Sequence, residues 1–201
     1  MLLGITNLYA QNVSLKSDNL EAVNVFMSSQ KLCGEEVIRV VKDSAITEFD
    51  EPTFVRIKDV NFTNGTIEVK VLSRLLPDAP DFSRGFIGLV FHVNNDNSKF
   101  ESIYVRPTNA RAENQLRRNH SIQYFAYPDF KFQRLRKESA EMYESYADMT
   151  LNEWITLRIE VNREKARLYI NDNEQPSLIV NDLKLGGNQQ GAIGMFVDVG
   201  T

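Results

Sequence analysis

The chain has 201 residues, a formal net charge of −4, and a composition that is 42% hydrophobic and 25% charged. This balance is typical of a globular protein and excludes a disordered or fibrous chain. No apolar run approaches the roughly 18 residues that a membrane-spanning helix needs. The single cysteine, Cys33, excludes an intrachain disulfide and a cysteine-cluster metal site.

The N-terminal stretch MLLGITNLYAQ is mildly apolar and contains the small-residue pattern Leu8-Tyr9-Ala10 just before the polar residues NVSLKSDN. This pattern is typical of the end of an export signal, and an ordinary first strand is an equally good interpretation. We predict that residues 1–11 are a signal-peptide remnant and that residues 12–201 form a single domain. The protein is then expected to be exported to the periplasm or the extracellular space.

Apolar and polar residues alternate along most of the remaining chain. In EWITLRIEVN, the apolar residues Ile155, Leu157, Ile159 and Val161 alternate with polar ones, as in an antiparallel strand with one solvated face. The same criterion predicts strands at residues 20–28, 35–42, 53–61, 65–73, 85–94, 99–106, 122–127, 153–162, 165–171, 177–181 and 191–199.

Two local signals complete the predicted fold. Asn64-Gly65 is typical of a hairpin turn, and Ser139 as an N-cap predicts one short helix over AEMYESYA. Many short strands without helical crossovers predict an all-β fold, namely a two-sheet antiparallel sandwich. Because the chain stops at VDVGT directly after a predicted strand, either a sheet edge is exposed or a final strand is missing.

A family resemblance appears at NEWITLRIEVNREKARLYINDNEQPSLIV followed by GAIGMFV, with GTIEVKV and GFIGLVFHV as earlier strands. These segments resemble the concanavalin A-like (laminin-G-like) jelly-roll superfamily. The chain is also similar to a subgroup of uncharacterised exported bacterial proteins, which resembles putative glycosyl or keto-disaccharide hydrolase domains. The resemblance implies carbohydrate binding or cleavage. The Glu-x-Asp-x-x-Glu acids of family-16-type glucanases are missing from the sequence, so that mechanism is not carried over.

A long basic insertion is predicted at residues 106–137, which hold eight Lys and Arg against two acids, Glu113 and Asp129, in an otherwise acidic chain. Aromatic faces stack on sugar rings and arginine forks bind their oxygens, so this composition favours a sugar ligand. The candidate ligand-binding residues are His92, Tyr104, Arg106, Asn109, Arg111, Gln115, His120, Gln123 and Tyr127.

Two structural alternatives compete with that interpretation. Strand alternation places Gly88, His92, Tyr104 and Arg106 on one outward face, where they form either a ligand patch or a second packed layer beneath a loop. The arginines can instead tie the insertion to the acids that follow it. That alternative pairs Arg117, Arg118, Arg134 and Arg136 with Glu138, Glu141, Glu144 and Asp148, and it leaves Arg106, Arg111, His120 and Tyr127 as the preferred ligand contacts.

Candidate catalytic residues are the two acids of the insertion, Glu113 and Asp129, with His120 as an alternative proton donor. With two histidines and one cysteine, the sequence predicts no metal site, and without a phosphate-binding loop it predicts no cofactor.

Three functions remain open from the sequence. The first is an exported carbohydrate-binding module for oligo- or polysaccharides, acidic ones included. The alternatives are a glycoside hydrolase of the same fold and a protein-interaction module. The overall acidity argues against a nucleic-acid partner.

Overall fold

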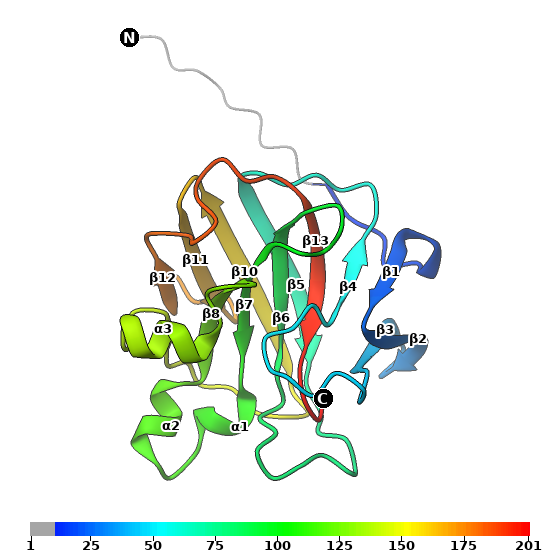
Figure 1. Ribbon diagram of the computed structural model, residues 1–201. Helices are drawn as coiled ribbons and strands as arrows, with labels where there is room; N and C mark the ends of the chain where they lie inside the picture. Colours follow the sequence, from blue (N-terminus) through cyan, green and yellow to red (C-terminus); the bar gives the residue numbers. More distant parts are fainter. Residues whose placement is uncertain (1–10) are drawn as a thin grey trace.

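The computed structural model describes residues 11–201 as two antiparallel sheets and a small hairpin (Figure 1). The seven-stranded sheet has the order β1 (Leu20–Val23), β4 (Phe54–Ile57), β13 (Ala192–Val197), β6 (Ile87–Val93), β7 (Phe100–Val105), β8 (Ile122–Tyr127) and β9 (Glu144–Ser145). The four-stranded sheet has the order β12 (Leu178–Val180), β11 (Lys165–Ile170), β10 (Trp154–Asn162) and β5 (Gly65–Leu72). The predicted all-β, two-sheet antiparallel sandwich is confirmed.

The four-stranded sheet has one buried and one solvated face. On β10 the residues Ile155, Leu157, Ile159 and Val161 are buried, and the residues between them are not. This is the alternation that predicted the strand. The buried side chains belong to the hydrophobic core that both sheets share.

The seven-stranded sheet is covered on both faces. Every residue of β7 and nearly every residue of β6 and β8 is buried, so no alternation survives there. One face packs on the four-stranded sheet. The other is covered by two segments, residues 43–53 and residues 130–138, which we call the roof (Figure 1). The two halves of the roof meet where the backbone N–H of Phe132 donates to Asp50 Oδ2 (2.7 Å) and where Lys131 pairs with Glu51.

Short helices lie at one end of this sheet. They are α1 (Pro107–Ala110), α2 (Gln115–Asn119) and α3 (Phe132–Glu138), with a 3₁₀ turn, η1 (Ser17–Asn19), near the start of the described chain. The helix predicted over residues 140–147 is wrong. That segment turns at Glu141, whose φ is 65°, and then adds β9 to the edge of β8. Burial of Tyr143 and Glu144 there outweighs the local helical tendency.

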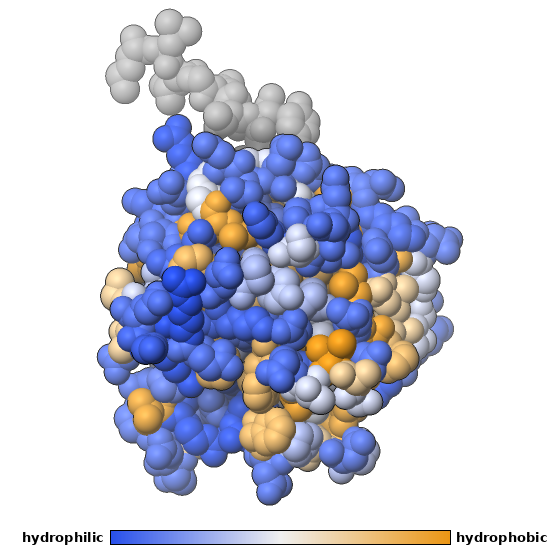
Figure 2. All heavy atoms as spheres, in the orientation of Figure 1, coloured by the Kyte–Doolittle hydropathy of each residue, from blue (hydrophilic) through white to orange (hydrophobic). Residues whose placement is uncertain are grey.

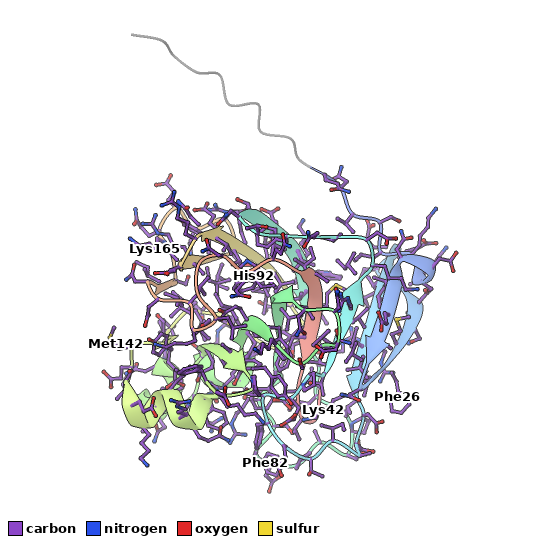
Figure 3. All side chains as sticks on the ribbon, turned by 45° about the horizontal axis from the view of Figure 1, so that its top comes forward. Phe26, Lys42, Phe82, His92, Met142 and Lys165 are labelled. Carbon is purple, nitrogen blue, oxygen red and sulfur yellow. The ribbon has the colours of Figure 1, made fainter. Side chains whose placement is uncertain are left out.

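The first predicted strand is divided in two. Asn24, with a φ of 51°, separates β1 from β2 (Val25–Leu32), which pairs with β3 (Glu35–Lys42) in a hairpin beside the sandwich. Its tip is the turn Cys33-Gly34, where both residues have positive φ and Cys33 is exposed. Phe26 projects from the outer side of this hairpin and is 64% exposed (Figure 3).

The last strand, β13, lies between β4 and β6, so it is paired on both sides and is not the exposed edge that the sequence suggested. The predicted signal-peptide remnant falls on residues 1–11, of which 1–10 lie outside the described residues. Within residues 11–201, no helix combines the length and apolar character needed to cross a bilayer.

Candidate functional site

An open depression of about 230 Å³ lies between the roof, the helices α1 and α2, and the segment that precedes β6. We call it the basic pocket, because its lining includes four arginines and no carboxylate. Its lining residues are Phe49, Phe82, Arg84, Phe86, Arg106, Asn109, Arg117, His120, Phe132 and Arg136. Figure 2 shows the face that carries the roof as mostly hydrophilic, with separate small groups of hydrophobic side chains at the upper left, along the right side and near the lower margin.

One wall of the basic pocket is aromatic. Phe49 is at its centre and contacts Phe82, Phe86 and Phe132 edge-to-face, with ring centroids 5.8, 5.9 and 6.0 Å apart. This arrangement is the one that ring quadrupoles favour. Phe82 is 51% exposed and lies at the lower margin of the molecule in Figure 3, so part of the wall is open to a ligand.

Arg106 forms the floor of the pocket. It is 4% exposed and follows directly after β7. Its Nη2 donates to Tyr104 Oη (2.7 Å) and Gln123 Oε1 (3.2 Å), and its Nη1 donates to the His120 carbonyl (3.1 Å). A guanidinium with this many fixed partners is rigidly placed.

Glu144, on β9, is the carboxylate closest to this floor and is almost fully buried. It accepts from Arg106 Nη1 (3.3 Å) and from Arg136 Nε (2.8 Å), and it lies 3.5 Å from His120 Nε2. Burial lowers the pKa of His120 despite the opposing effect of this carboxylate. At neutral pH His120 is therefore uncharged, and Glu144 balances one of the two arginines.

Arg84 and Arg117 carry positive charge that Glu144 does not balance. Arg84 donates to the backbone carbonyls of Asp81 (2.7 Å) and Ser83 (2.8 Å), and Arg117 donates to Asn109 Oδ1 (3.2 and 3.3 Å). In the described part of the chain, neither forms an ion pair. Burial, followed by the positive charges of Arg117 and Arg106, lowers the pKa of Arg84. Such a pair favours an anionic ligand.

A second depression, of about 260 Å³, adjoins the basic pocket, and we call it the polar depression. Its lining residues are Asn119, His120, Glu141, Glu144, Ser145 and Tyr146. His120 lines both depressions. The charge of the lining changes from positive to negative across this residue.

Asp50, in the first segment of the roof, forms a buried acidic pair with Asp198 directly after β13. Asp198 binds Lys42 Nζ at 2.6 Å and accepts from the Asp50 backbone N–H at 3.1 Å. Asp50 accepts from Phe132, and its second carboxylate oxygen, Oδ1, has no hydrogen-bond partner. Burial, and then the charge of Asp198, raise the pKa of Asp50 to about 6.

The predicted outward patch is not a surface. His92, Tyr104 and Arg106 are 3%, 1% and 4% exposed. Phe86 of the segment that precedes β6 packs on Tyr104 and Arg106, and Phe132 of the roof packs on Arg106, whereas Phe62 stacks on His92. The alternative of a second packed layer is therefore correct for Tyr104, and also for Gln123, which is fully buried. His92 binds the Thr63 carbonyl at 2.8 Å and lies far from Phe82 in Figure 3, so it is not part of the basic pocket.

The basic insertion divides into residues that line the pocket and residues that do not. Arg106, Asn109 and His120, which are among the predicted ligand contacts, line the pocket, and their contact with a ligand stays a prediction. The other candidates lie elsewhere. Arg111 forms an exposed ion pair with Asp148 (2.8 Å), Gln115 donates to Asn119 (2.8 Å), and Tyr127 stacks on Phe100 with centroids 5.1 Å apart.

The predicted bracing ion pairs are confirmed in part. Arg136 pairs with Glu144, and Arg134 pairs with Glu138 at 2.9 Å. Arg118 donates instead to Tyr146 Oη (3.1 Å). Arg117 and Arg111 exchange the partners that the sequence assigned to them, because Arg117 lines the pocket while Arg111 forms an exposed ion pair with Asp148.

The predicted catalytic residues are not brought together. Glu113 and Asp129 are exposed, and neither lines either depression, whereas His120 lies against Glu144. Among residues 11–201, no group of three or more His, Cys, Asp or Glu side chains is placed to hold a metal ion.

Several pocket residues come from segments that the sequence analysis did not single out. Arg84, Phe82 and Phe86 belong to PDFSRGF before β6, and Phe49 belongs to EFDEP. The sequence feature that could have indicated this part of the pocket is Arg84 between Phe82 and Phe86 in a turn-rich segment. It does not reveal that the roof folds over this segment.

No protein-family model and no curated protein matches the chain. Among solved structures, a carbohydrate-binding module, CBM66, from Bacillus subtilis has a TM-score of 0.57 and 13% identity, covering 90% of this chain and 89% of its own. An exo-inulinase from Aspergillus awamori has a TM-score of 0.25 and 8% identity, covering 85% of this chain and 34% of its own. The first likeness shows a shared β-sandwich fold, and the second is too loose to support an argument.

Proposed function

We propose that this protein is an exported, non-catalytic carbohydrate-binding module that holds oligo- or polysaccharides in the basic pocket and prefers acidic sugars. The observation that carries this proposal is the lining of the pocket. An open aromatic wall stands beside Arg84 and Arg117, which have no ion-pair partner in the described chain. Stacking on the wall suits a sugar ring, and the arginines suit a carboxylate or sulfate on that ring.

Two further points support binding over cleavage. Hydrolysis by two carboxyls needs both to be free to act on the scissile bond, whereas the lining of the basic pocket contains no carboxyl and the adjoining Glu144 is held in ion pairs with Arg106 and Arg136. The shared fold with a protein described as a carbohydrate-binding module agrees with the proposal. The proposal includes export, because acidic polysaccharides occur outside the cell. Fractionation of cells that express the full-length protein tests this part of the proposal.

Calorimetric titration against neutral and acidic oligosaccharides, followed by an assay for released sugar, tests the proposal. We expect saturable binding of acidic sugars, weaker binding at high salt, and no product. Arg84→Gln and Arg117→Gln should each weaken binding about 10- to 100-fold, because each removes a hydrogen bond to a charged group. Arg111→Gln is the matched control, since this exposed arginine lies outside the pocket. Absence of heat with every sugar, or equal losses in the control, would refute the proposal.

A further inference from the structure

We infer that the basic pocket and the polar depression are two contiguous subsites of one site, so that the ligand is a sugar carrying an anionic group joined to a neutral sugar. This inference rests on the proposed function and adds to it the length and charge pattern of the ligand. The anionic ring occupies the basic pocket, and the neutral ring occupies the polar depression.

The two depressions meet at one shared residue and one ion-pair network. Both depressions are lined by His120, whose side chain is 17% exposed and stands against Glu144. Arg106 and Arg136 reach from the basic pocket to Glu144 in the polar depression, so one ion-pair network forms the boundary between the two. A ligand that leaves the basic pocket past His120 therefore enters the polar depression directly.

The volumes of the two depressions suit a ligand of two sugar rings. The depressions measure about 230 and 260 Å³, and each is smaller than the roughly 300–1,000 Å³ of a typical small-molecule site. Together they fall within that range. Each is suited to one ring, and the pair is suited to a disaccharide unit.

The residues that line the polar depression suit a neutral sugar ring. The polar depression has a partly exposed ring, Tyr146, over which the Arg118 guanidinium lies at 5.3 Å. Around it are the Asn119 amide, which can bond hydroxyls, and two carboxylates, Glu141 and Glu144. Carboxylates accept hydrogen bonds from sugar hydroxyls, and the exposed Glu141, which forms no ion pair within residues 11–201, repels a second anionic group, whereas Glu144 is balanced by Arg106 and Arg136. The second ring is therefore neutral.

The test compares glucuronic acid with a panel of aldobiouronic acids, in which glucuronic acid is joined to one neutral sugar through different linkages. We expect at least one disaccharide to bind about 3- to 10-fold tighter than glucuronic acid, the gain from one aromatic contact. Digalacturonic acid, in which both rings carry a carboxylate, should bind no tighter than galacturonic acid. Tyr146→Ala should abolish the gain and leave the affinity for glucuronic acid unchanged.

Controls keep the outcomes distinct. Trp154→Ala removes an aromatic side chain of the same exposure, 41%, from the four-stranded sheet and should change neither affinity. Asn119→Ala provides a second test of the polar depression if Tyr146→Ala does not fold. Binding of glucuronic acid with no gain for any disaccharide would overturn this inference and leave the proposed function intact. If neither glucuronic acid nor any acidic disaccharide binds, the proposed function fails and this inference fails with it.

Discussion

The buried carboxyl of Asp50 leads to a specific prediction about how stability depends on pH. Asp50 is fully buried in the roof beside Asp198, with one carboxylate oxygen unpaired. Its pKa is raised from 3.8 to about 6, first by burial and then by the charge of Asp198. The folded protein therefore holds this proton more tightly than the unfolded chain does.

The sign and the size follow from that difference. Well below pH 4 Asp50 is protonated in both states and costs no stability. As the pH rises toward 6, the unfolded chain ionises first, so the folded state loses stability relative to it. A shift of about 2 pH units corresponds to about 3 kcal/mol, and this full penalty is present above pH 6.

The perturbation is Asp50→Asn, which keeps the shape and removes the charge. Urea denaturation from pH 4 to pH 8, followed by far-UV circular dichroism, gives the free energy of unfolding of both proteins. We expect the stability advantage of the variant over the parent to grow by about 2–2.5 kcal/mol between pH 4 and pH 7, because part of the full penalty is already present at pH 4. Taking the difference between the two proteins cancels the titration of the groups that do not interact with Asp50.

Asp148→Asn is the matched control. The hydrogen bond from Arg111 lowers the pKa of Asp148, so the stability that this exposed carboxylate contributes is present above pH 4 and is lost only below it. The difference between this variant and the parent should therefore stay level from pH 4 to pH 7. A level difference for Asp50→Asn over the same range, or a difference that falls as the pH rises, would refute the reasoning.

Two further predictions concern stability alone. Arg106→Ala should destabilise the fold by about 3–5 kcal/mol, because it leaves Glu144 buried with one partner fewer, whereas Arg111→Ala should leave the melting temperature unchanged. Equal melting temperatures for the two variants would show that the buried contacts of Arg106 do not stabilise the fold. Gly88→Ala should cost about 1–3 kcal/mol, measured by urea denaturation, because a Cβ would lie 2.5 Å from the Tyr104 Cβ. An unchanged denaturation midpoint would show that the two strands can move apart.

The strands were predictable because alternation and apolar runs are local properties of the sequence. The alternating pattern of β10 defines a half-buried strand whatever it packs against. The hairpin turn predicted at Asn64-Gly65 is wrong for a reason that is not local. Gly65 has a positive φ, as expected, but β4 pairs with β1 and β13 while β5 pairs with β10, so the turn crosses between sheets.

The candidate site was predictable only in part, because it depends on contacts between distant segments. The basic insertion supplies Arg106, Asn109 and His120 to the pocket, as its composition suggested. The aromatic wall requires the two halves of the roof to meet, and Asp50 and Phe132, which join them, are 82 residues apart in the chain. No pattern within either segment indicates that contact.

The position of Cys33 has a practical consequence for the experiments above. It is the one thiol in the sequence, it is exposed, and it lies at the tip of the β2–β3 hairpin, on the opposite side of the sandwich from α1, α2 and α3 in Figure 1. A maleimide dye or a biotin handle can therefore be attached at a single defined point without mutagenesis. Immobilised through that point, the protein presents the basic pocket to solution, so weak sugars can be ranked on a sensor surface with every molecule in the same orientation.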